Sequence, residues 1–402
     1  MRIALIADTF PPLRTSGAVQ LRDLSREFAD QGHRITVLLP SSTIKQPWTL
    51  EWVENVQVLR LRAPKIKDVN YIRRTLSELF MPFFMWRNLN QSPLAGEQWD
   101  GVVWYSPSIF HGPLVRAMKS SSNCSSYLII RDIFPQWAAD MGIISKRGLT
   151  YLFFNAVARF QYSVANTIGV QTPGNLHYFK NWAADKNRHI EVLQNWLFNS
   201  PVGKCSILLS KTKLAGRKIF VYAGNMGVAQ GVGIFLDIAE LLQARLDIGF
   251  LFVGRGSDAS QLANDAKSRG LNNVLFCDEI HPDEIPGLYA QCAVGLVALD
   301  SRHKSHNIPG KFLTYMQAGL PVLAKINSGN DLVGIIKKNN VGRVIVDEER
   351  HSLARQASEL LDFLEVDRNV KDRCRNLYLE LFSPAMAVKQ IVYALEERVE
   401  AI

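Results

Sequence analysis

Short apolar runs that alternate with helical patterns are the feature of this 402-residue sequence that most restricts its fold. A run from Arg2 to Ala7 is followed by a helical pattern that ends at Gly32, and a second run occupies Arg34–Leu39. These runs are apolar throughout, which is typical of parallel strands covered on both faces. Further strands of this kind are predicted at Val56–Leu61, Gly101–Trp104, Tyr127–Ile130, Thr167–Gln171 and Ile190–Leu193.

A second series of the same kind begins after a polar stretch at residues 199–217. Its strands are predicted at Lys218–Ala223, Ile248–Val253, Val274–Cys277, Ala293–Ala298 and Leu320–Ala324. Two such series predict an α/β protein with two doubly wound, Rossmann-like domains, residues 1–198 and 199–383, that face each other across a cleft. Residues 384–402 are predicted to form a helix that either seals one domain or packs back on the N-terminal one.

Several classes of protein are excluded by composition. No uncharged apolar run reaches about 18 residues, and the run after Met1 is broken at Asp8, too early for a signal peptide. The five cysteines are widely spaced without a Cys-x-x-Cys pair, so a disulfide framework or zinc site is not expected and a reducing cytoplasm fits. The net charge is +9, but no motif points to nucleic acid. Three explanations of the positive net charge remain: binding of nucleotide diphosphates, binding of anionic lipid head groups, and a charge that only keeps the protein soluble.

Three glycine-containing loops follow predicted strands of the second domain. They are Gly224–Gly231, Gly254–Ser257 and Asn307–Phe312. Glycine lets backbone N–H groups approach a phosphate closely, and each loop leads into a helix whose N-terminus adds free donors. Lys311 adds a compact positive charge. One such loop is often only turn geometry, but three at one sheet edge indicate diphosphate binding.

The first strand lacks the signature of a dinucleotide-binding dehydrogenase. It is followed by Asp8-Thr-Phe-Pro-Pro rather than Gly-x-Gly-x-x-Gly, and the sequence contains no P-loop. Gly17, at the start of the next helix, is suited instead to approach an anion from the opposite domain.

Motifs spread over nearly the whole chain resemble those of retaining glycosyltransferases with the GT-B fold, in the large family four that includes many lipopolysaccharide and capsule enzymes. The motifs are Phe10-Pro11-Pro12…Gly17, Arg131–Pro135, Tyr222–Asn225, Phe252–Gly256 and Ile308–Val322. Within that family, the Asp132 segment and residues 307–322 together are most similar to O-antigen N-acetyl-L-fucosamine transferases.

The resemblance implies a UDP-sugar donor in the second domain and an acceptor in the first. Gly17 would face the donor diphosphate, and residues 278–280, with Asp278 and Ile280, would contact the base. The helix that opens at Gly310 and Lys311 would cradle the phosphates and the sugar. The remaining donor-binding positions implied in this way are Gly224, Asn225, Gly254, Arg255, Asn307, Ile308, Pro309 and Thr314.

Two departures from the family pattern change the expected contacts. Many members carry two glutamates, spaced E-x7-E, that touch the donor sugar and the ribose; His306 and Thr314 occupy these positions here. The usual arginine and lysine that neutralise the diphosphate are replaced by Asn225 and Gln230, which supply no charge. Lys311 and Arg255 are therefore expected to supply it.

In the expected reaction, the main task of the protein is to stabilise the negative charge on the leaving diphosphate. Lys311, helix dipoles and loop amides can do this, and no DxD-like carboxylate pair lies on a suitable loop, so no metal or other cofactor is expected. Retaining transfer in this fold is generally described as front-face attack, with the leaving phosphate taking the acceptor proton. Asp132 is the candidate for positioning the acceptor, or else a turn or N-cap carboxylate. His306 is a further catalytic candidate, and His111 either lines the cleft or starts a helix without a ligand role.

The segment Ile72–Arg87 has the composition of a membrane-surface helix. Basic residues lie at both ends with aromatic residues between them: Arg73, Arg74, Phe83, Phe84, Trp86 and Arg87. A lipid-linked acceptor would make membrane docking useful. The alternative is a buried helix kinked at Pro82, because aromatic stripes usually belong to a core.

Together these features predict a metal-independent retaining glycosyltransferase, peripheral on the cytoplasmic face of the inner membrane. It would move a sugar, in the narrowest reading N-acetyl-L-fucosamine, from UDP to a lipid-diphosphate-linked glycan of O-antigen or another surface polysaccharide. Its expected partners are the UDP-sugar donor, the lipid-linked saccharide acceptor and the membrane surface, without nucleic acid. The alternatives are a UDP-sugar epimerase of the same fold and a non-catalytic nucleotide-sugar-binding subunit.

Overall fold

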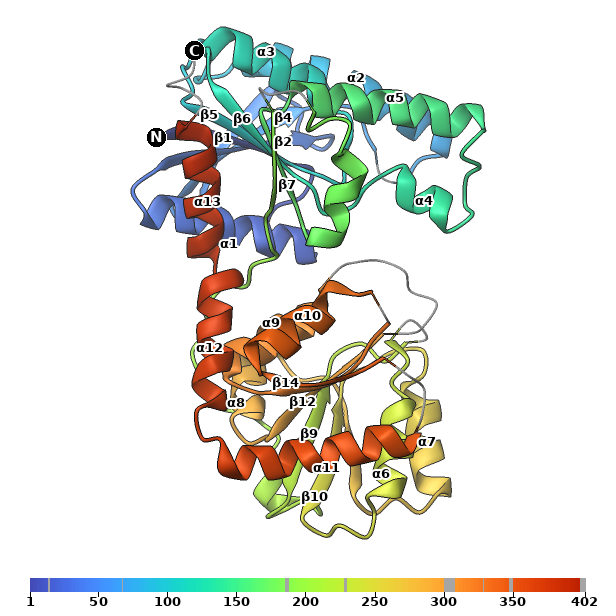
Figure 1. The fold of residues 1–402 in the computed structure, drawn as a ribbon. Coiled ribbons are helices and arrows are strands. Elements are labelled where there is room, and N and C mark those ends of the chain that lie inside the picture. The colour runs from blue at the N-terminus through green and yellow to red at the C-terminus, as the bar shows by residue number, and fades with distance from the viewer. Residues whose placement is uncertain are drawn as a thin grey trace. The chain divides into compact units, whose positions relative to one another are not determined.

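The computed structural model describes residues 1–13, 15–66, 68–184, 188–227, 230–299, 308–327, 329–346 and 350–397. The chain divides into two compact units, one formed by Met1–Gln194 with the residues from Pro384 onward, the other by Asn195–Ser383. Each unit holds one sheet with helices on both of its faces (Figure 1).

The sheet of the first unit has the strand order β3-β4-β2-β1-β5-β6-β7-β8. Neighbouring strands are parallel except for β3 and β4, which are antiparallel. The strands are β1 (Arg2–Ile6), β2 (Arg34–Ser41), β3 (Trp48–Val53), β4 (Val56–Arg62), β5 (Gly101–Tyr105), β6 (Ser125–Ile129), β7 (Thr167–Val170) and β8 (His189–Val192).

Two groups of helices cover this sheet. Helices α1 and α13 pack together on one face, while α3 packs between α2 and α5 on the other. The helices are α1 (Ser16–Asp30), α2 (Tyr71–Leu89), α3 (Gly112–Ser122), α4 (Gln136–Asp140), α5 (Leu149–Val164) and α13 (Pro384–Glu396), with a 3-10 helix at Pro173–Phe179. Helix α13 thus adds a layer to the first unit from the far end of the sequence.

The sheet of the second unit is wholly parallel, with the order β11-β10-β9-β12-β13-β14. Its strands are β9 (Lys218–Ala223), β10 (Ile248–Val253), β11 (Val274–Cys277), β12 (Val294–Ala298), β13 (Val322–Lys325) and β14 (Gly342–Ile345). Its helices are α6 (Ile234–Leu241), α7 (Ala259–Ser268), α8 (Ile285–Tyr289), α9 (Gly310–Ala318), α10 (Asp331–Asn339), α11 (Arg350–Val366) and α12 (Val370–Leu381), with 3-10 turns at Leu209–Lys211 and Pro282–Glu284.

The predicted fold class, two doubly wound α/β sheets of parallel strands, is confirmed. Strands β3 and β14, each at one edge of its sheet, were not predicted from the sequence. Strand β3 is half-exposed and joins β4 through a two-residue turn at Glu54 and Asn55, both with positive φ, so it belongs to an antiparallel hairpin rather than to a buried strand. Neither β3 nor β14 carries the continuous apolar run that marked most of the other strands.

Helix α2 runs from Tyr71 to Leu89 without a break, although Pro82 lies inside it. Pro82 therefore does not end the helix. No helix within the described ranges has the length and apolar character needed to cross a membrane.

Candidate active site

The loops after β9, β10 and β11 are joined by backbone hydrogen bonds at one edge of the second unit's sheet. The Gly224 N–H donates to the Val253 carbonyl at 2.8 Å, and the Gly254 N–H donates to the Cys277 carbonyl at 3.1 Å. Two residues further along, the Met226 N–H donates to the Arg255 carbonyl at 2.8 Å. Because the strands are parallel and adjacent, their carboxyl ends place these three loops side by side.

Two of the glycines are required by this loop packing itself. Gly254 has a φ of +138°, and a Cβ there would lie 2.2 Å from the Gly224 carbonyl oxygen. Gly256 has a φ of +153°, and a Cβ there would lie 2.2 Å from the Met226 carbonyl oxygen. No larger residue fits at either position, so the packing of the loops explains why both residues are glycine, whether or not a ligand binds there.

Helix α9 begins at the same sheet edge, after β12. Its N-cap residue is Pro309, it follows the buried Ile308, and it ends at Gly319, which adopts the left-handed conformation. The buried Tyr315 holds the helix against the sheet, since its hydroxyl donates to the carbonyls of Val221 at 3.0 Å and Leu296 at 3.3 Å. These bonds fix the middle of α9 against β9 and β12.

Gly295 makes room for this anchor. A Cβ on Gly295 would lie 2.5 Å from the ring of Tyr315. Neither residue could be recognised from the sequence as a positioning residue, because a tyrosine in a helical pattern and a glycine in a strand carry no local signal of such a contact.

Lys311 brings its ammonium group back to the first glycine loop. Its Nζ lies 4.7 Å from the centre of the Tyr222 ring, and a Cβ on Gly224 would be 2.9 Å from it. Burial lowers the pKa of Lys311 to about 8. Among the residues that the structure describes, no carboxylate forms an ion pair with Lys311. Lys311 is therefore a partly desolvated cation at a helix N-terminus, and Gly224 leaves the space beside it free of a side chain.

The two amides at the positions of the usual arginine and lysine bind each other. The Asn225 side chain donates to Gln230 Oε1 at 3.1 Å, and the Gly227 N–H donates to the same oxygen at 3.1 Å. Arg255, by contrast, is highly exposed and pairs with Glu279 at 2.9 Å. Exposed pairs of this kind are weak, so Arg255 can exchange Glu279 for another anion.

The remaining predicted donor residues have varied environments. Asp278 is exposed at the end of β11, whereas Ile280 packs against the core of the unit. The Thr314 hydroxyl donates to the Lys311 carbonyl at 2.8 Å, one turn along α9. His306 and Asn307 lie outside the described residues.

In the first unit, Gly17 lies in the first turn of α1, whose N-cap residue Thr15 accepts a hydrogen bond from the Ala18 N–H at 3.3 Å. A Cβ on Gly17 would meet Thr9 at 3.3 Å and the Tyr105 hydroxyl at 3.5 Å. This position therefore lies at the carboxyl edge of the first sheet, where β1 and β5 end.

Asp132 follows β6 at that same edge. Its side chain reaches the surface, yet partial desolvation by the surrounding protein raises its pKa above the usual value, an effect that the neighbouring Arg131 opposes. Its backbone carbonyl accepts from the Ser106 hydroxyl at 3.3 Å. Asp132 does not cap α4, whose N-cap residue is Pro135.

His111 is fully buried at the N-cap position of α3, and its Nε2 lies 2.8 Å from the Asp8 carboxylate. The half-buried Glu78 of α2 lies close enough to this pair to interact with it electrostatically, and burial raises its pKa. This pair was not predicted from the sequence, because His111 and Asp8 are separated by more than one hundred residues and meet only through the sheet.

The residues predicted to contact a membrane lie on α2 and differ in exposure. The exposed members are Arg73, Arg74, Phe83, Phe84 and Arg87. Trp86 is half-buried and packs against the core, and the inner side of the helix carries the buried Met81 and Met85.

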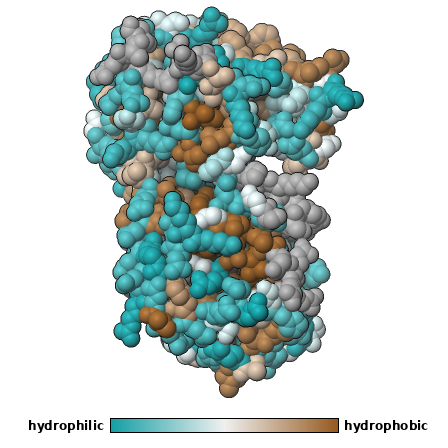
Figure 2. All heavy atoms as spheres, viewed as in Figure 1, coloured by the Kyte–Doolittle hydropathy of each residue, from teal (hydrophilic) through white to brown (hydrophobic). Residues whose placement is uncertain are grey.

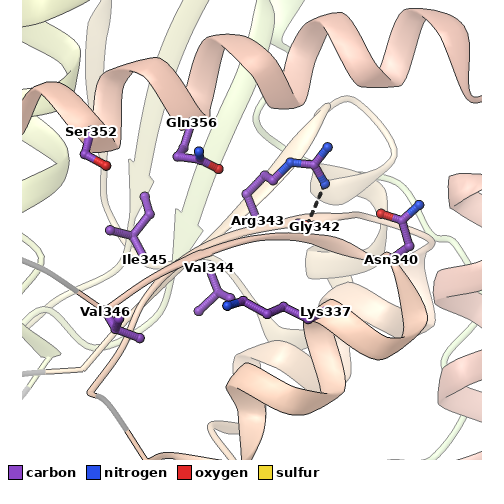
Figure 3. Close-up of a pocket in the computed structure, with 9 residues that line it drawn as sticks. All are labelled: Lys337, Asn340, Gly342, Arg343, Val344, Ile345, Val346, Ser352 and Gln356. Carbon is purple, nitrogen blue, oxygen red and sulfur yellow. Dashed lines mark hydrogen bonds between the residues drawn. The ribbon is translucent and has the colours of Figure 1, made fainter.

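A separate shallow pocket of about 430 Å³ lies along the edge strand β14. Lys337, Arg343 and Gln356 are among the residues that line it (Figure 3). Arg343 turns its guanidinium over the Phe363 ring and donates to the Gly342 carbonyl. The pocket does not include any of the glycine loops. In the part of the chain that the structure describes, no cluster of three or more His, Cys, Asp or Glu residues could hold a metal ion.

Sequence comparisons agree with this geometry. The model of the family "Glycosyl transferases group 1" matches residues 217–362, which contain β9 through most of α11. The probable glycosyltransferase WbjE of Pseudomonas aeruginosa is 24% identical to the chain over 387 residues, covering 92% of each protein.

Solved structures with the same architecture cover nearly the whole chain. HepE of Anabaena, crystallised with UDP and glucose, has a TM-score of 0.62 at 14% identity and full coverage of both chains. WaaG, a glycosyltransferase involved in lipopolysaccharide biosynthesis, has a TM-score of 0.59 at 16% identity and covers 97% of this chain and 99% of its own. The family match at residues 217–362 and the similarity to WbjE over most of the chain identify a glycosyltransferase, and the solved structures show that its fold is GT-B.

Proposed function

We propose that this enzyme transfers a sugar from a UDP-sugar to a lipid-diphosphate-linked glycan, with retention at the anomeric carbon, during assembly of O-antigen or another surface polysaccharide. The narrowest form of the proposal names N-acetyl-L-fucosamine as the sugar, on the strength of the Asp132 segment and the motif that ends at Val322. The involvement of WaaG in lipopolysaccharide biosynthesis supports the broader form.

The observation that carries the proposal is the position of Lys311. A half-buried ammonium group without an ion-pair partner in the described chain lies between the Tyr222 ring and the Gly224 loop, at the N-terminus of α9. Such a group binds an anion strongly because it is already desolvated and held in place. The UDP and glucose bound by HepE support a nucleotide sugar as that anion.

In the proposed reaction, the bond between the anomeric carbon and the diphosphate oxygen breaks, and both electrons leave with the diphosphate. The acceptor oxygen forms its new bond on the same face of the sugar, and its proton passes to the leaving phosphate oxygen. Lys311 and the first N–H groups of α9 stabilise the negative charge that develops on the diphosphate. This arrangement would work without a metal ion or other cofactor.

The first unit would hold the acceptor. Asp132, at the end of β6, is proposed to position the acceptor sugar, and Gly17 to let the start of α1 approach the donor diphosphate. The exposed aromatic and arginine residues of α2 are proposed to hold the enzyme at the cytoplasmic face of the inner membrane, where a lipid-linked acceptor resides.

Transfer from radiolabelled UDP-sugars to a detergent-solubilised, lipid-diphosphate-linked acceptor tests the proposal. Donors can first be ranked by the thermal stabilisation that UDP-, GDP- and dTDP-sugars give. We expect label in the lipid-linked product with UDP-N-acetyl-L-fucosamine among the active donors. Turnover of the donor without acceptor would indicate an epimerase, and UDP binding without any turnover over a broad donor panel would contradict transfer.

A further inference from the structure

Helix α5 presents an apolar stripe to solvent. Leu149 is 85% exposed and Leu152 51%, and Phe153 and Phe160 are exposed on the same side. These positions recur at helical spacing, so they form one face. The opposite face is anchored in the core, where Phe154 packs against the rings of Phe110 and Phe134 and the buried Ala158 and Gln161 follow it. Both the anchored and the exposed faces are thus apolar.

This stripe lies on the same side of the sheet as the exposed residues of α2, because α3 packs between the two helices. Figure 2 shows hydrophobic residues along the upper rim of the first unit, in the region of α5 in Figure 1. The exposed large apolar residues of α2 are Tyr71, Ile72, Leu76, Phe80, Phe83 and Phe84. We call the outward surface of α2, α3 and α5 the outer helical face. Apolar surface gathered in this way marks a binding surface.

The outer helical face is also strongly basic. Its three helices carry six basic residues, Arg73, Arg74, Arg87, Arg116, Lys119 and Arg159, and a single acidic residue, Glu78, which pairs with Arg74 at 2.9 Å. The helices on the other side of the sheet differ: α1 carries two arginines against three acids, and α13 one lysine against one glutamate. The positive charge of the first unit's helices is therefore concentrated on the side that exposes apolar residues.

We propose that α5 joins α2 in a two-helix platform that lies on an anionic lipid bilayer, with the exposed stripe of α5 buried at the level of the head groups. The proposal rests on the proposed membrane-linked acceptor and extends the contact to a helix that the sequence analysis did not single out. Apolar residues of both helices enter the bilayer boundary, while the arginines around them attract anionic head groups. A second copy of the chain is a poorer occupant, because a two-fold interface would bring two basic faces together.

Flotation with vesicles tests the platform. The full-length protein is mixed with vesicles of phosphatidylcholine alone or of phosphatidylcholine and phosphatidylglycerol in equal amounts. We expect binding to the anionic vesicles, and a loss of roughly tenfold or more in L152S/F153S on α5, similar to the loss in L76S/F80S on α2. The matched control is Y393S, which removes an exposed aromatic residue of α13 on the other side of the sheet. Two further variants each remove one positive charge. R159Q on α5 is expected to weaken binding to anionic vesicles, whereas R26Q on α1 is expected to leave it unchanged.

The outcomes separate this proposal from the proposed function. If wild-type protein does not bind anionic vesicles, or if L152S/F153S binds as wild type does while L76S/F80S does not, α5 has no part in a platform. If L152S/F153S changes the mass in light scattering while vesicle binding persists, the stripe is a protein interface and the proposal is wrong. Circular dichroism checks that each variant is folded. Transfer to a detergent-solubilised acceptor reports on the chemistry independently, since failure of the wild type there contradicts only the proposed reaction.

Discussion

The ammonium group of Lys311 lies in a space created by residues around it rather than by its own helix. Gly224 offers no side chain where a Cβ would be 2.9 Å from Nζ, and the Tyr222 ring lies 4.7 Å from it. The two positions at which the resemblance implies an arginine and a lysine carry Asn225 and Gln230, and these two amides are bonded to each other. One cation is therefore expected to do most of the electrostatic work at the diphosphate.

Replacing Lys311 with alanine is expected to lower kcat/KM by about 10²–10³-fold, because one preorganised charge that stabilises the leaving group is lost. Steady-state transfer assays and calorimetric UDP titrations measure the effect. Lys267→Ala, at an exposed lysine in the last turn of α7, is the matched control and should behave as wild type. Equal activity of Lys311→Ala and Lys267→Ala would remove Lys311 from the mechanism.

The titration of Lys311 gives a pH signature. Its pKa of about 8 in the folded protein lies below the ordinary 10.5, because burial disfavours the charged form. UDP affinity is therefore expected to fall as the pH rises through about 8, where the ammonium loses its proton. Between the two values the unfolded chain binds more protons, so the contribution of this group to stability rises with pH in that window.

Proton uptake by Lys311 on UDP binding tests its pKa more directly than the pH dependence of the affinity does. Around pH 8.5, UDP binding should restore the proton on Lys311, so the binding enthalpy should depend on the ionisation enthalpy of the buffer. Titrations in two buffers reveal this dependence, and Lys311→Ala should abolish it. Buffer-independent enthalpy in the wild-type protein would show that Lys311 does not gain a proton on binding.

At the scale of elements, α9 is held by its packing against the sheet. Tyr315 reaches the carbonyls of Val221 and Leu296, and this position is open only because residue 295 is glycine. The sequence predicted that a helix opens at Gly310 and Lys311, but the contact between this helix and β12 could not be read from either segment alone.

Gly295→Ala is expected to destabilise the second unit by about 1–3 kcal/mol, because the new Cβ meets the Tyr315 ring and must displace α9. UDP affinity should fall with it, since Lys311 moves with the helix. Thermal unfolding and UDP titration measure the two effects. Gly334→Ala in α10 is the control: nothing lies within 4 Å of the added Cβ, and alanine favours the helix, so stability should stay the same or rise slightly. Unchanged UDP affinity in a destabilised Gly295→Ala would show that α9 does not set the position of the binding group.

The composition of helix α2 did not decide whether the helix is exposed or buried. Its pattern of aromatic and basic residues fitted both a membrane-surface helix and a buried, kinked one. The structure separates the two sides of the helix: Met81 and Met85 are buried, whereas Ile72 is 77% and Phe83 58% exposed. The spacing of apolar residues predicted a helix. Only its contacts with β4 and α3 decided which side faces inward.

At the scale of the whole molecule, the chain ends in the unit in which it began. Helix α13 places the fully buried Val388, Ile391 and Leu395 on the first sheet, and Gln390 donates to the Val192 carbonyl at 3.0 Å. Leu395 lies directly on β5, where a Cβ on Gly101 would be 2.7 Å from it. The first unit therefore depends on the last helix of the sequence.

Leu395→Ala is expected to destabilise the first unit by about 2–5 kcal/mol, because a cavity opens against β5. UDP affinity should fall far less than it does in Lys311→Ala, since the glycine turns after β9 and β10 and Lys311 belong to the second unit. Hydrogen exchange resolves the two units, and Lys389→Ala, an exposed position on the same helix, serves as the control. If exchange in the first unit is unaffected by Leu395→Ala, α13 is not part of its core.

The sequence by itself determined the two parallel sheets, because continuous apolar runs between helical patterns can be buried only in that way. It also determined the glycine turns that follow β9 and β10 and the helix at Gly310, since turns and caps depend on neighbouring residues. Only the tertiary structure decided that Gly254 and Gly256 pack against another loop, that Tyr315 anchors α9, that His111 meets Asp8, and that α5 turns a second apolar side outward. These contacts join residues far apart in the chain, and no local pattern encodes the distance between them.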